Sequence, residues 1–284
     1  MSFVTRFAPS PTGLLHLGHA FSALRAFDAA QAAGGRFLLR IEDIDQTRAR
    51  DEFEAAIYQD LAWLGLNWEE PVRRQSAHMG EYEAVLNTLI ARGLVYRCFR
   101  TRKELLAAIA SAPHETEPVF VGEALPTAEE QERLEAGETF AWRLSQKKAR
   151  AALGPAYFAL TFQDETGLVR AEPAKLGDVV LARKEFPTSY HLASVWDDAL
   201  QGVTHVIRGD DLRESAHLHV LLQKLLSLPT PTYQHHRLIV NEEGKRLAKR
   251  DAALSIRALR EAGMTPHEVR AMVMTASNAP ISQP

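Results

Sequence analysis

The sequence has a single cysteine, Cys98, among 284 residues. One thiol excludes an internal disulfide framework and an all-cysteine metal site, which favours a reducing compartment, so a cytoplasmic location is expected. No run approaches the roughly 18 uninterrupted apolar residues that a membrane span requires, and the N-terminus lacks the apolar core of a signal peptide. Neither export nor membrane anchoring is predicted.

A charge excess of either sign is also missing. The chain has 33 Lys and Arg against 36 Asp and Glu, a net charge of -3. It therefore has no overall attraction for a polyanion, and any contact with nucleic acid must use a local basic patch. Hydrophobic residues make up 46% of the chain, enough for one large or two modest domains.

Strands and helices alternate in the first part of the chain. Residues 2–7 form a β-prone run, residues 8–13 are rich in turn formers, and residues 18–33 are alanine-rich with helical spacing. Residues 36–41 (RFLLRI) have the composition of a buried strand, and residues 48–64 have an apolar helix face. This alternation predicts a parallel sheet.

The pattern changes in the middle of the chain. A helix is expected at residues 78–92 and a third strand at 94–96, which would complete the first half of the sheet. From residue 98 to about 185 a polar Glu- and Ala-rich tract (127–138) and short strand-like runs such as 140–144 indicate an inserted α+β domain.

The alternation then resumes and completes an α/β, doubly wound parallel sheet. We expect a helix at 190–200, a strand at 204–207, a helix at 213–226, a strand at 237–240, and short C-terminal helices at 255–261 and 266–275. The predicted segments are 1–97 and 186–240 for the two halves of a nucleotide-binding domain, 98–185 for the insert, and 241–284 for a basic loop with the C-terminal helices.

The first motif is His16-Leu17-Gly18-His19, where the turn-rich loop enters the first helix. Two imidazoles at an open helix N-terminus can face the phosphates of a nucleotide, and glycine allows the nucleotide to approach the backbone. The alternative is two surface histidines near a helix start. The position directly after a strand and a Pro-rich turn favours the nucleotide site.

The segment FAPSPTG (residues 7–13) together with HLGH and RIEDID (residues 40–45) resembles the opening of glutamyl-tRNA synthetases. The resemblance implies a class I synthetase fold of the Rossmann type. The three carboxylates of the second motif follow a buried strand, and open α/β sheets bind ligands at that edge. A carboxylate there, Glu42 by the resemblance, can hold the ammonium group of an amino acid.

A third motif, KRLAKR at residues 245–250, looks like the KMSKS loop of class I synthetases, with Lys249 as its second lysine. A basic hexamer alone is more often a solvated loop or a general polyanion patch. At this distance from the other motifs, a lysine can instead neutralise charge that builds on transferring phosphates.

The segment VIRGDDL (residues 206–212) resembles the family's stretch in which an arginine contacts the substrate glutamate. A guanidinium can pair bidentately with a carboxylate, which would select glutamate over glutamine. For Tyr190 the alternative is an aromatic side chain packed in the core. The implied glutamate site comprises Arg6, Phe7, Ala8, Pro9, Ser10, Glu42, Tyr190 and Arg208. The implied ATP site comprises His16, Gly18, His19, Arg246, Leu247, Ala248, Lys249 and Arg250, with His16, His19 and Lys249 as the catalytic residues.

The chain ends about 35 residues after the KMSKS-like loop, where a glutamyl-tRNA synthetase would continue into an anticodon-binding region. This resembles the truncated glutamyl-Q tRNA(Asp) synthetase family, which places glutamate on queuosine. The expected partners are glutamate, ATP with Mg²⁺, and the anticodon stem-loop of tRNA(Asp), with Arg213, Arg246 and Arg250 as phosphate contacts of a monomer.

Three alternatives remain. The chain could be a short glutamyl-tRNA synthetase that charges the CCA end, or an inactive RNA-binding module descended from a synthetase. A small-molecule nucleotidyltransferase also shares HxGH, but FAPSPTG and RIEDID favour an amino-acid site.

One departure from the resembled family concerns metal. Its members often bind zinc through Cys-x-Cys and a later Tyr-x3-Cys, whereas the equivalent stretches here read Cys98-Phe99-Arg100 and Phe120-Val121-Gly122-Glu123-Ala124. One thiolate and no nearby histidine pair do not make a four-ligand tetrahedral site, and His114 alone does not complete one. No protein-bound metal is therefore expected, and the insert should fold by apolar packing.

Overall fold

The structure, a computed structural model, describes residues 2–101, 103–105, 119–183, 186–239 and 255–278. The chain forms two compact units. The first comprises residues 1–77, 202–213 and 231–284, and the second comprises residues 78–201 and 214–230. The boundary predicted at residue 97 falls within the second unit. No helix among the described residues is long and apolar enough to span a membrane.

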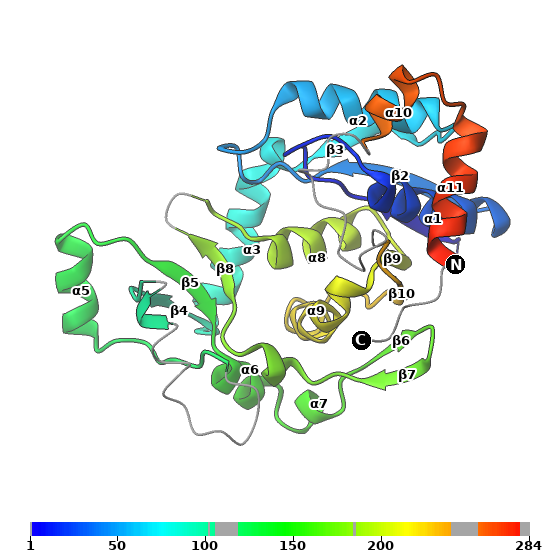
Figure 1. The fold of residues 1–284 in the computed structure, drawn as a ribbon. Helices are drawn as coiled ribbons and strands as arrows, with labels where there is room; N and C mark the ends of the chain where they lie inside the picture. The colour runs from blue at the N-terminus through cyan, green and yellow to red at the C-terminus, as the bar shows by residue number, and fades with distance from the viewer. Residues whose placement is uncertain (1, 102, 106–118, 184–185, 240–254, 279–284) are drawn as a thin grey trace. The chain divides into compact units, whose positions relative to one another are not determined.

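The first unit contains parallel strands with helices packed on them (Figure 1). Its elements are β1 (Val4–Phe7), α1 (Leu17–Ala32), β2 (Arg36–Ile41), α2 (Asp51–Trp63), β3 (Glu69–Arg74), η1 (Gln75–His78), β9 (His205–Gly209), η3 (Asp210–Leu212), β10 (Thr232–His236), α10 (Ile256–Glu261) and α11 (Pro266–Asn278). Strand order is β1-β2-β3, and β9 pairs with β10. Thr204, directly before β9, donates to the Val4 carbonyl at 2.9 Å, so β9 lies beside β1.

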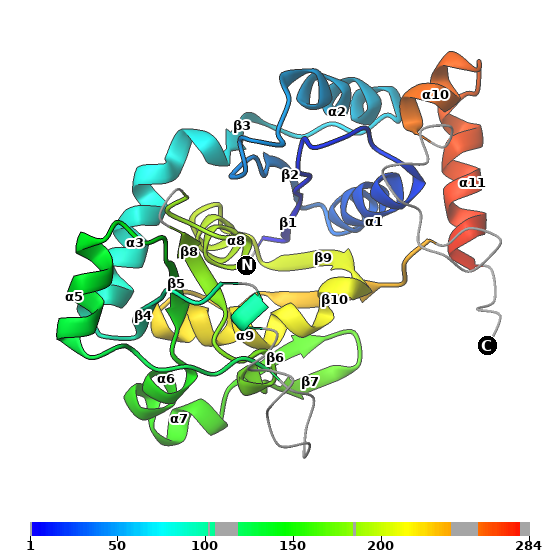
Figure 2. The ribbon, with the colours of Figure 1, turned by 60° about the vertical axis from the view of Figure 1, so that its left-hand side comes forward.

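The core of the first unit lies between these strands and helices. α1 contributes alanines and large apolar side chains, and the C-terminal helices contribute Ile256, Leu259, Val269 and Val273. Figure 2 shows α10 beside α2 and α11 beside α1. The last helices of the chain therefore complete the core that the first strand and helix begin.

The second unit combines antiparallel strands with helices. Its elements are α3 (Met79–Ala91), β4 (Val95–Cys98), α5 (Thr127–Glu135), β5 (Ala141–Leu144), α6 (Gln146–Leu153), α7 (Pro155–Phe158), β6 (Thr161–Asp164), β7 (Gly167–Arg170), η2 (Pro173–Leu176), β8 (Val180–Arg183), α8 (Tyr190–Leu200) and α9 (Arg213–Leu225), whose first residue belongs to the first unit. β4-β5-β8 form one sheet and β6-β7 form a hairpin. α3 is joined to α8 by the buried Tyr82 hydroxyl, which donates to the Asp197 carboxylate at 2.9 Å.

Two predicted strands need correction, and a third strand was not predicted. The run at 94–96 forms β4, but it pairs antiparallel with β5 and does not join the parallel sheet. The parallel partner of β2 is β3, whose sequence EEPVRR has no apolar alternation and contains a proline, as an edge strand allows. The strand expected at 237–240 is β10, which ends at His236. Three of its five residues, Tyr233, His235 and His236, are buried, although the sequence TYQHH is largely polar.

A buried carboxyl joins α2 to α10. Asp60 has no exposed surface, lies 3.4 Å from the Arg260 guanidinium, and accepts no side-chain hydrogen bond from the described residues. Burial raises the pKa of Asp60 to about 6, against the opposing effect of Arg260. The carboxylate is therefore held in an environment that disfavours its charge at neutral pH.

We expect Asp60→Asn to stabilise the protein at pH 7 by up to about 3 kcal/mol. Because the folded pKa lies above the unfolded value, the folded state binds more protons between about pH 4 and pH 6, and stability falls as pH rises through that window. Urea unfolding from pH 4 to pH 7 measures this loss, which the variant should lack. Glu52→Gln, an exposed change on the same helix, is the control, and an unchanged pH profile in Asp60→Asn would contradict the argument.

Candidate active site

The HLGH segment caps the N-terminus of α1 with its own two histidines. His16 is the N-cap residue, and its Nδ1 accepts the Gly18 backbone N–H at 3.1 Å. His19 Nδ1 accepts the His16 backbone N–H at 3.2 Å, and the two ring centroids are 3.8 Å apart. Since each Nδ1 is an acceptor here, each neutral ring carries its proton on Nε2. Two Nε2–H donors are thus fixed together at a helix N-terminus, where phosphate binding is favourable.

Glycine at position 18 has a steric reason. A Cβ on Gly18 would lie 3.0 Å from His16 Cε1 and 3.1 Å from His16 Nδ1. A larger residue would require the His16 ring to move by a few tenths of an ångström from its place in the cap. The glycine of this motif therefore sets the imidazole geometry, in addition to leaving room for a nucleotide.

Main-chain hydrogen bonds fix the proline-containing loop that precedes HLGH. The Glu42 N–H donates to the Pro9 carbonyl at 3.0 Å, and the Arg50 N–H donates to the Pro11 carbonyl at 3.0 Å. Phe7 and Pro9 are buried, Ala8 is half-buried, and Ser10 is exposed. The residue after β2 and the residue before α2 therefore hold the loop, and Glu42 lies beside Pro9.

The three carboxylates after β2 have separate roles. Glu42 forms an ion pair at 3.0 Å with Arg40, whose side chain is fully buried. The Asp45 carboxylate accepts hydrogen bonds from Thr47 and Arg48. Asp43 is buried and accepts from Ser76 and Arg74. All three carboxylates are therefore paired within the protein, and the role of Glu42 at the ammonium group of a substrate remains a prediction.

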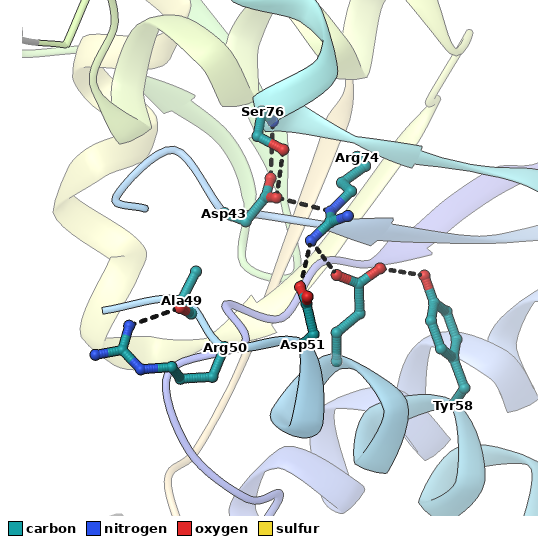
Figure 3. Close-up of polar contacts among 8 residues, drawn as sticks. Asp43, Ala49, Arg50, Asp51, Tyr58, Arg74 and Ser76 are labelled. Carbon is teal, nitrogen blue, oxygen red and sulfur yellow. Dashed lines mark hydrogen bonds and ion pairs between the residues drawn. The ribbon is translucent and has the colours of Figure 1, made fainter. Parts of the chain in front are cut away.

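Arg74 is a residue that the sequence did not single out. Its guanidinium pairs with Asp43 at 2.9 Å, Asp51 at 3.1 Å and Glu54 at 2.8 Å, as Figure 3 shows for Asp43 and Asp51. The Tyr58 hydroxyl donates to Glu54 at 2.9 Å, and burial together with this carboxylate raises the pKa of Tyr58. Arg74 thus joins the end of β3 to the loop after β2 and to α2. The only sequence signal was a pair of arginines in an otherwise atypical strand.

The two arginines predicted to bind glutamate are buried on adjacent strands. Arg6 lies on β1 and Arg208 on β9. Arg208 Nε donates to His235 Nε2 at 3.3 Å, its Nη2 donates to the Leu212 carbonyl at 2.9 Å, and its guanidinium lies 5.2 Å from the Tyr233 ring centroid. His235 and Tyr233, both on β10, hold Arg208 in place and were missed because that strand was misplaced.

Tyr190 belongs to the second unit. It is the first residue of α8, is half-buried, and has its ring centroid 5.3 Å from that of His191 and 5.6 Å from that of His219. These histidines explain its packing within that unit. Its role in the glutamate site remains a prediction.

The KMSKS-like loop, with Arg246, Leu247, Ala248, Lys249 and Arg250, lies outside the described residues. Its two flanks are described and belong to one core, since Ile239 before it and Ile256 after it are both buried there. Ser255 forms a β-bridge with His16, and the Ile256 N–H donates to the Leu15 carbonyl at 2.8 Å. The chain therefore leaves the loop directly beside HLGH.

The region equivalent to the family's zinc site contains arginines and aromatic rings. Cys98 is buried at the end of β4 and lines a cavity of about 390 Å³ together with Arg97, Arg100 and Arg133. The Arg100 guanidinium lies 5.7 Å from the Phe120 ring centroid. The cavity is also lined by Glu104, Glu123 and Glu129, so arginines and carboxylates balance there, and Cys98 is its single thiol.

We expect the purified protein to contain no stoichiometric zinc and to keep its melting temperature in the presence of a chelator, because Arg100 and Phe120 occupy positions where ligands would be needed. Elemental analysis by plasma mass spectrometry, with calorimetry before and after EDTA, measures both. One zinc per chain, or a chelator-dependent loss of stability, would refute the expectation.

Comparisons with known proteins identify the family of the chain. The family model described as tRNA synthetases class I (E and Q), catalytic domain, matches residues 2–279. The chain is 46% identical to a glutamyl-Q tRNA(Asp) synthetase of Rhodobacter capsulatus, covering 95% of this chain and 99% of that protein. It is 36% identical to glutamate–tRNA ligase 1 of Hyphomonas neptunium, covering 96% of this chain and 59% of the ligase.

Solved structures give the same result for the fold. The glutamate-tRNA synthetase of Elizabethkingia anophelis superposes with a TM-score of 0.77 at 28% identity, covering 96% of this chain and 61% of that one. The α/β fold predicted from the sequence is confirmed. The chain belongs to the class I tRNA synthetases of the glutamate and glutamine type and, within them, to the glutamyl-Q tRNA(Asp) synthetase family.

Proposed function

We propose that this enzyme activates glutamate with ATP and transfers the glutamyl group to queuosine in the anticodon of tRNA(Asp). The observation that carries the proposal is the paired Nε2–H donors of His16 and His19 at the N-terminus of α1, next to the loop fixed by Glu42. This arrangement supports binding of ATP phosphates close to the amino-acid site.

The first step forms glutamyl-adenylate. An oxygen of the glutamate α-carboxylate attacks the α-phosphorus of ATP, the bond from that phosphorus to the oxygen that bridges to the β-phosphate breaks, and pyrophosphate leaves. The Mg²⁺ that accompanies ATP would neutralise charge on the phosphates. His16, His19 and, from the KMSKS-like loop, Lys249 stabilise the charge on the transferring phosphates. No protein nucleophile is required, so catalysis comes from positioning and electrostatics.

Glutamate would be held by groups of opposite charge. Arg208, oriented by His235, and Arg6 supply guanidinium groups for carboxylates, while Glu42 supplies a carboxylate for the ammonium group. Tyr190 would complete the site. In the second step a queuosine hydroxyl attacks the adenylate carbonyl, AMP leaves, and the hydroxyl proton goes to solvent.

The proposed acceptor is favoured over the CCA end by similarity. Five glutamyl-Q tRNA(Asp) synthetases are 39% to 46% identical to this chain, against 36% and 37% for glutamate–tRNA ligases. The inactive-module alternative is disfavoured because the HLGH geometry and the buried arginines are intact. Of the predicted phosphate contacts, Arg213 pairs with Asp210 at 2.6 Å, whereas Arg246 and Arg250 lie outside the described residues.

A single assay tests the acceptor. Radiolabelled glutamate is offered to tRNA(Asp) with and without queuosine, and the product is cleaved between the anticodon and acceptor halves. Label on the anticodon half of the queuosine-containing tRNA alone is the expected result. Label on the acceptor half would establish the short glutamyl-tRNA synthetase, and absence of both label and glutamate-dependent pyrophosphate exchange would leave the inactive module.

A further inference from the structure

The second unit has a basic surface that the proposed reaction does not use. Between Glu138 and Asp164 the chain has no acidic residue but four basic ones, Arg143, Lys147, Lys148 and Arg150, in a protein with net charge -3. Lys147, Lys148 and Arg150 are exposed on α6, and Phe158 on α7 is 46% exposed. We call Lys147, Lys148, Arg150 and Phe158 the α6–α7 platform.

The platform is held in shape by buried contacts beneath it. Gly154, with φ of 54°, makes the turn between the two short helices, and Pro155 starts α7. The Tyr157 hydroxyl donates to the Gln146 side chain at 3.0 Å, and Gln146 donates in turn to the Pro173 and Gly177 carbonyls at 3.1 Å and 3.0 Å. The turn brings Phe158 to Arg150, whose guanidinium lies 4.6 Å from the ring centroid.

The three cations of the platform contribute little to the stability of the fold. Lys147 pairs with Glu123, but both side chains are about three-quarters exposed, and such pairs contribute little. Lys148 and Arg150 have no carboxylate partner in the part of the chain that the structure describes. Lysines in the first turn of α6 also lie where the helix dipole disfavours positive charge. Their arrangement is therefore better explained by an external anion.

The exposed residues between the platform side chains are small, which suits contact with a nucleic-acid backbone. Ala151, Ala152 and Ala156 are exposed within the same two helices, and these small side chains allow a phosphate chain to come close. Arg150, restrained on the Phe158 ring, loses little freedom on binding a phosphate. We propose that the α6–α7 platform binds the sugar–phosphate backbone of the RNA substrate outside the reaction site. This inference rests on the proposed function in that RNA is the acceptor.

The test measures RNA binding directly, so that it does not depend on which hydroxyl is glutamylated. Fluorescence anisotropy with a synthetic tRNA(Asp) anticodon stem-loop and with full-length tRNA(Asp) gives Kd over a range of salt concentrations. Lys148→Glu/Arg150→Glu should raise Kd at least tenfold at low salt and reduce the slope of log Kd against log salt by about 1.5, as expected for two lost phosphate contacts. The kcat for glutamylation at saturating RNA should stay within twofold.

Two further variants separate the platform from general charge. Lys103→Glu/Lys224→Glu reverses two exposed cations elsewhere in the second unit and should leave Kd within twofold. Phe158→Ala removes the support of Arg150 without changing charge and should raise Kd about two- to fivefold, whereas Phe158→Tyr should not. The inference is overturned if the platform reversal matches the control, or if the wild-type protein binds neither RNA. Wild-type protein that binds RNA but does not glutamylate queuosine would instead refute the proposed function alone.

Discussion

Replacing His16 by alanine is expected to slow glutamyl-adenylate formation by about 10²- to 10³-fold while changing glutamate affinity only a few-fold. The ring's Nε2–H is directed by the Nδ1 bond to Gly18, so the donor is fixed before the reaction begins. Its contribution arises as charge develops on the phosphates, which affects the rate more than ground-state binding. Rapid-quench measurement of adenylate, with a titration of glutamate, separates the two.

The alanine variant also loses a helix cap, so a second substitution is needed. His16→Asn retains a side-chain acceptor for the Gly18 N–H, and asparagine is a favourable N-cap residue. It should keep the melting temperature of the wild-type protein but show the same loss of rate, because its side chain lacks Nε2–H. Wild-type turnover in His16→Asn would make the imidazoles a structural feature only.

Arg208→Gln is expected to lower kcat/KM for glutamate by roughly 10²- to 10³-fold, mainly through KM. The buried guanidinium is the group of this strand that can pair with a carboxylate, and glutamine has no charge to replace it. Arg208→Lys should recover only part of the loss, since a lysine cannot form the bidentate pair. Initial rates of pyrophosphate exchange over a glutamate series give both constants.

A matched variant addresses the orientation of Arg208. His235→Phe keeps the arginine but removes the imidazole that accepts from its Nε, and should raise KM about tenfold with little change in kcat. Glutamate kinetics that are equally normal in Arg208→Gln and His235→Phe would place the substrate carboxylate elsewhere.

The sequence predicted those parts of the fold whose signal is local. The run RFLLRI matches β2 residue for residue, because a short apolar run has the composition of a buried strand. The helix expected at 190–200 is α8, where apolar side chains recur at helical spacing. HLGH was placed correctly for the same reason. Its strand, turn and helix start are contiguous, so the capping geometry follows from short-range structure.

What could not be predicted depends on partners distant in sequence. β3 is polar and lies at the edge of its sheet, and the buried histidines of β10 have hydrogen-bond partners, Ser22 and Arg208, that are distant in sequence. The sequence placed Asp43 in a group of carboxylates expected to face a ligand. In the structure the Asp43 carboxylate accepts hydrogen bonds from Arg74 and Ser76, which lie more than 30 residues away in the chain. A residue that orients a site cannot be identified from the sequence alone when its role depends on such a distant partner.

The order of segments in the first unit has a consequence for protein synthesis. β1 and α1 leave the ribosome first, yet their neighbours β9 and β10 and the core residues of α11 are made more than 170 residues later. The apolar surface of α1, including Phe21 and Phe27, therefore stays uncovered until those later segments are made. All segments of the second unit, in contrast, have been made by residue 230. A chain that ends in the basic loop would contain every segment of the second unit but would lack α10 and α11, so the core of its first unit would stay open, and chaperones are expected to bind such a species.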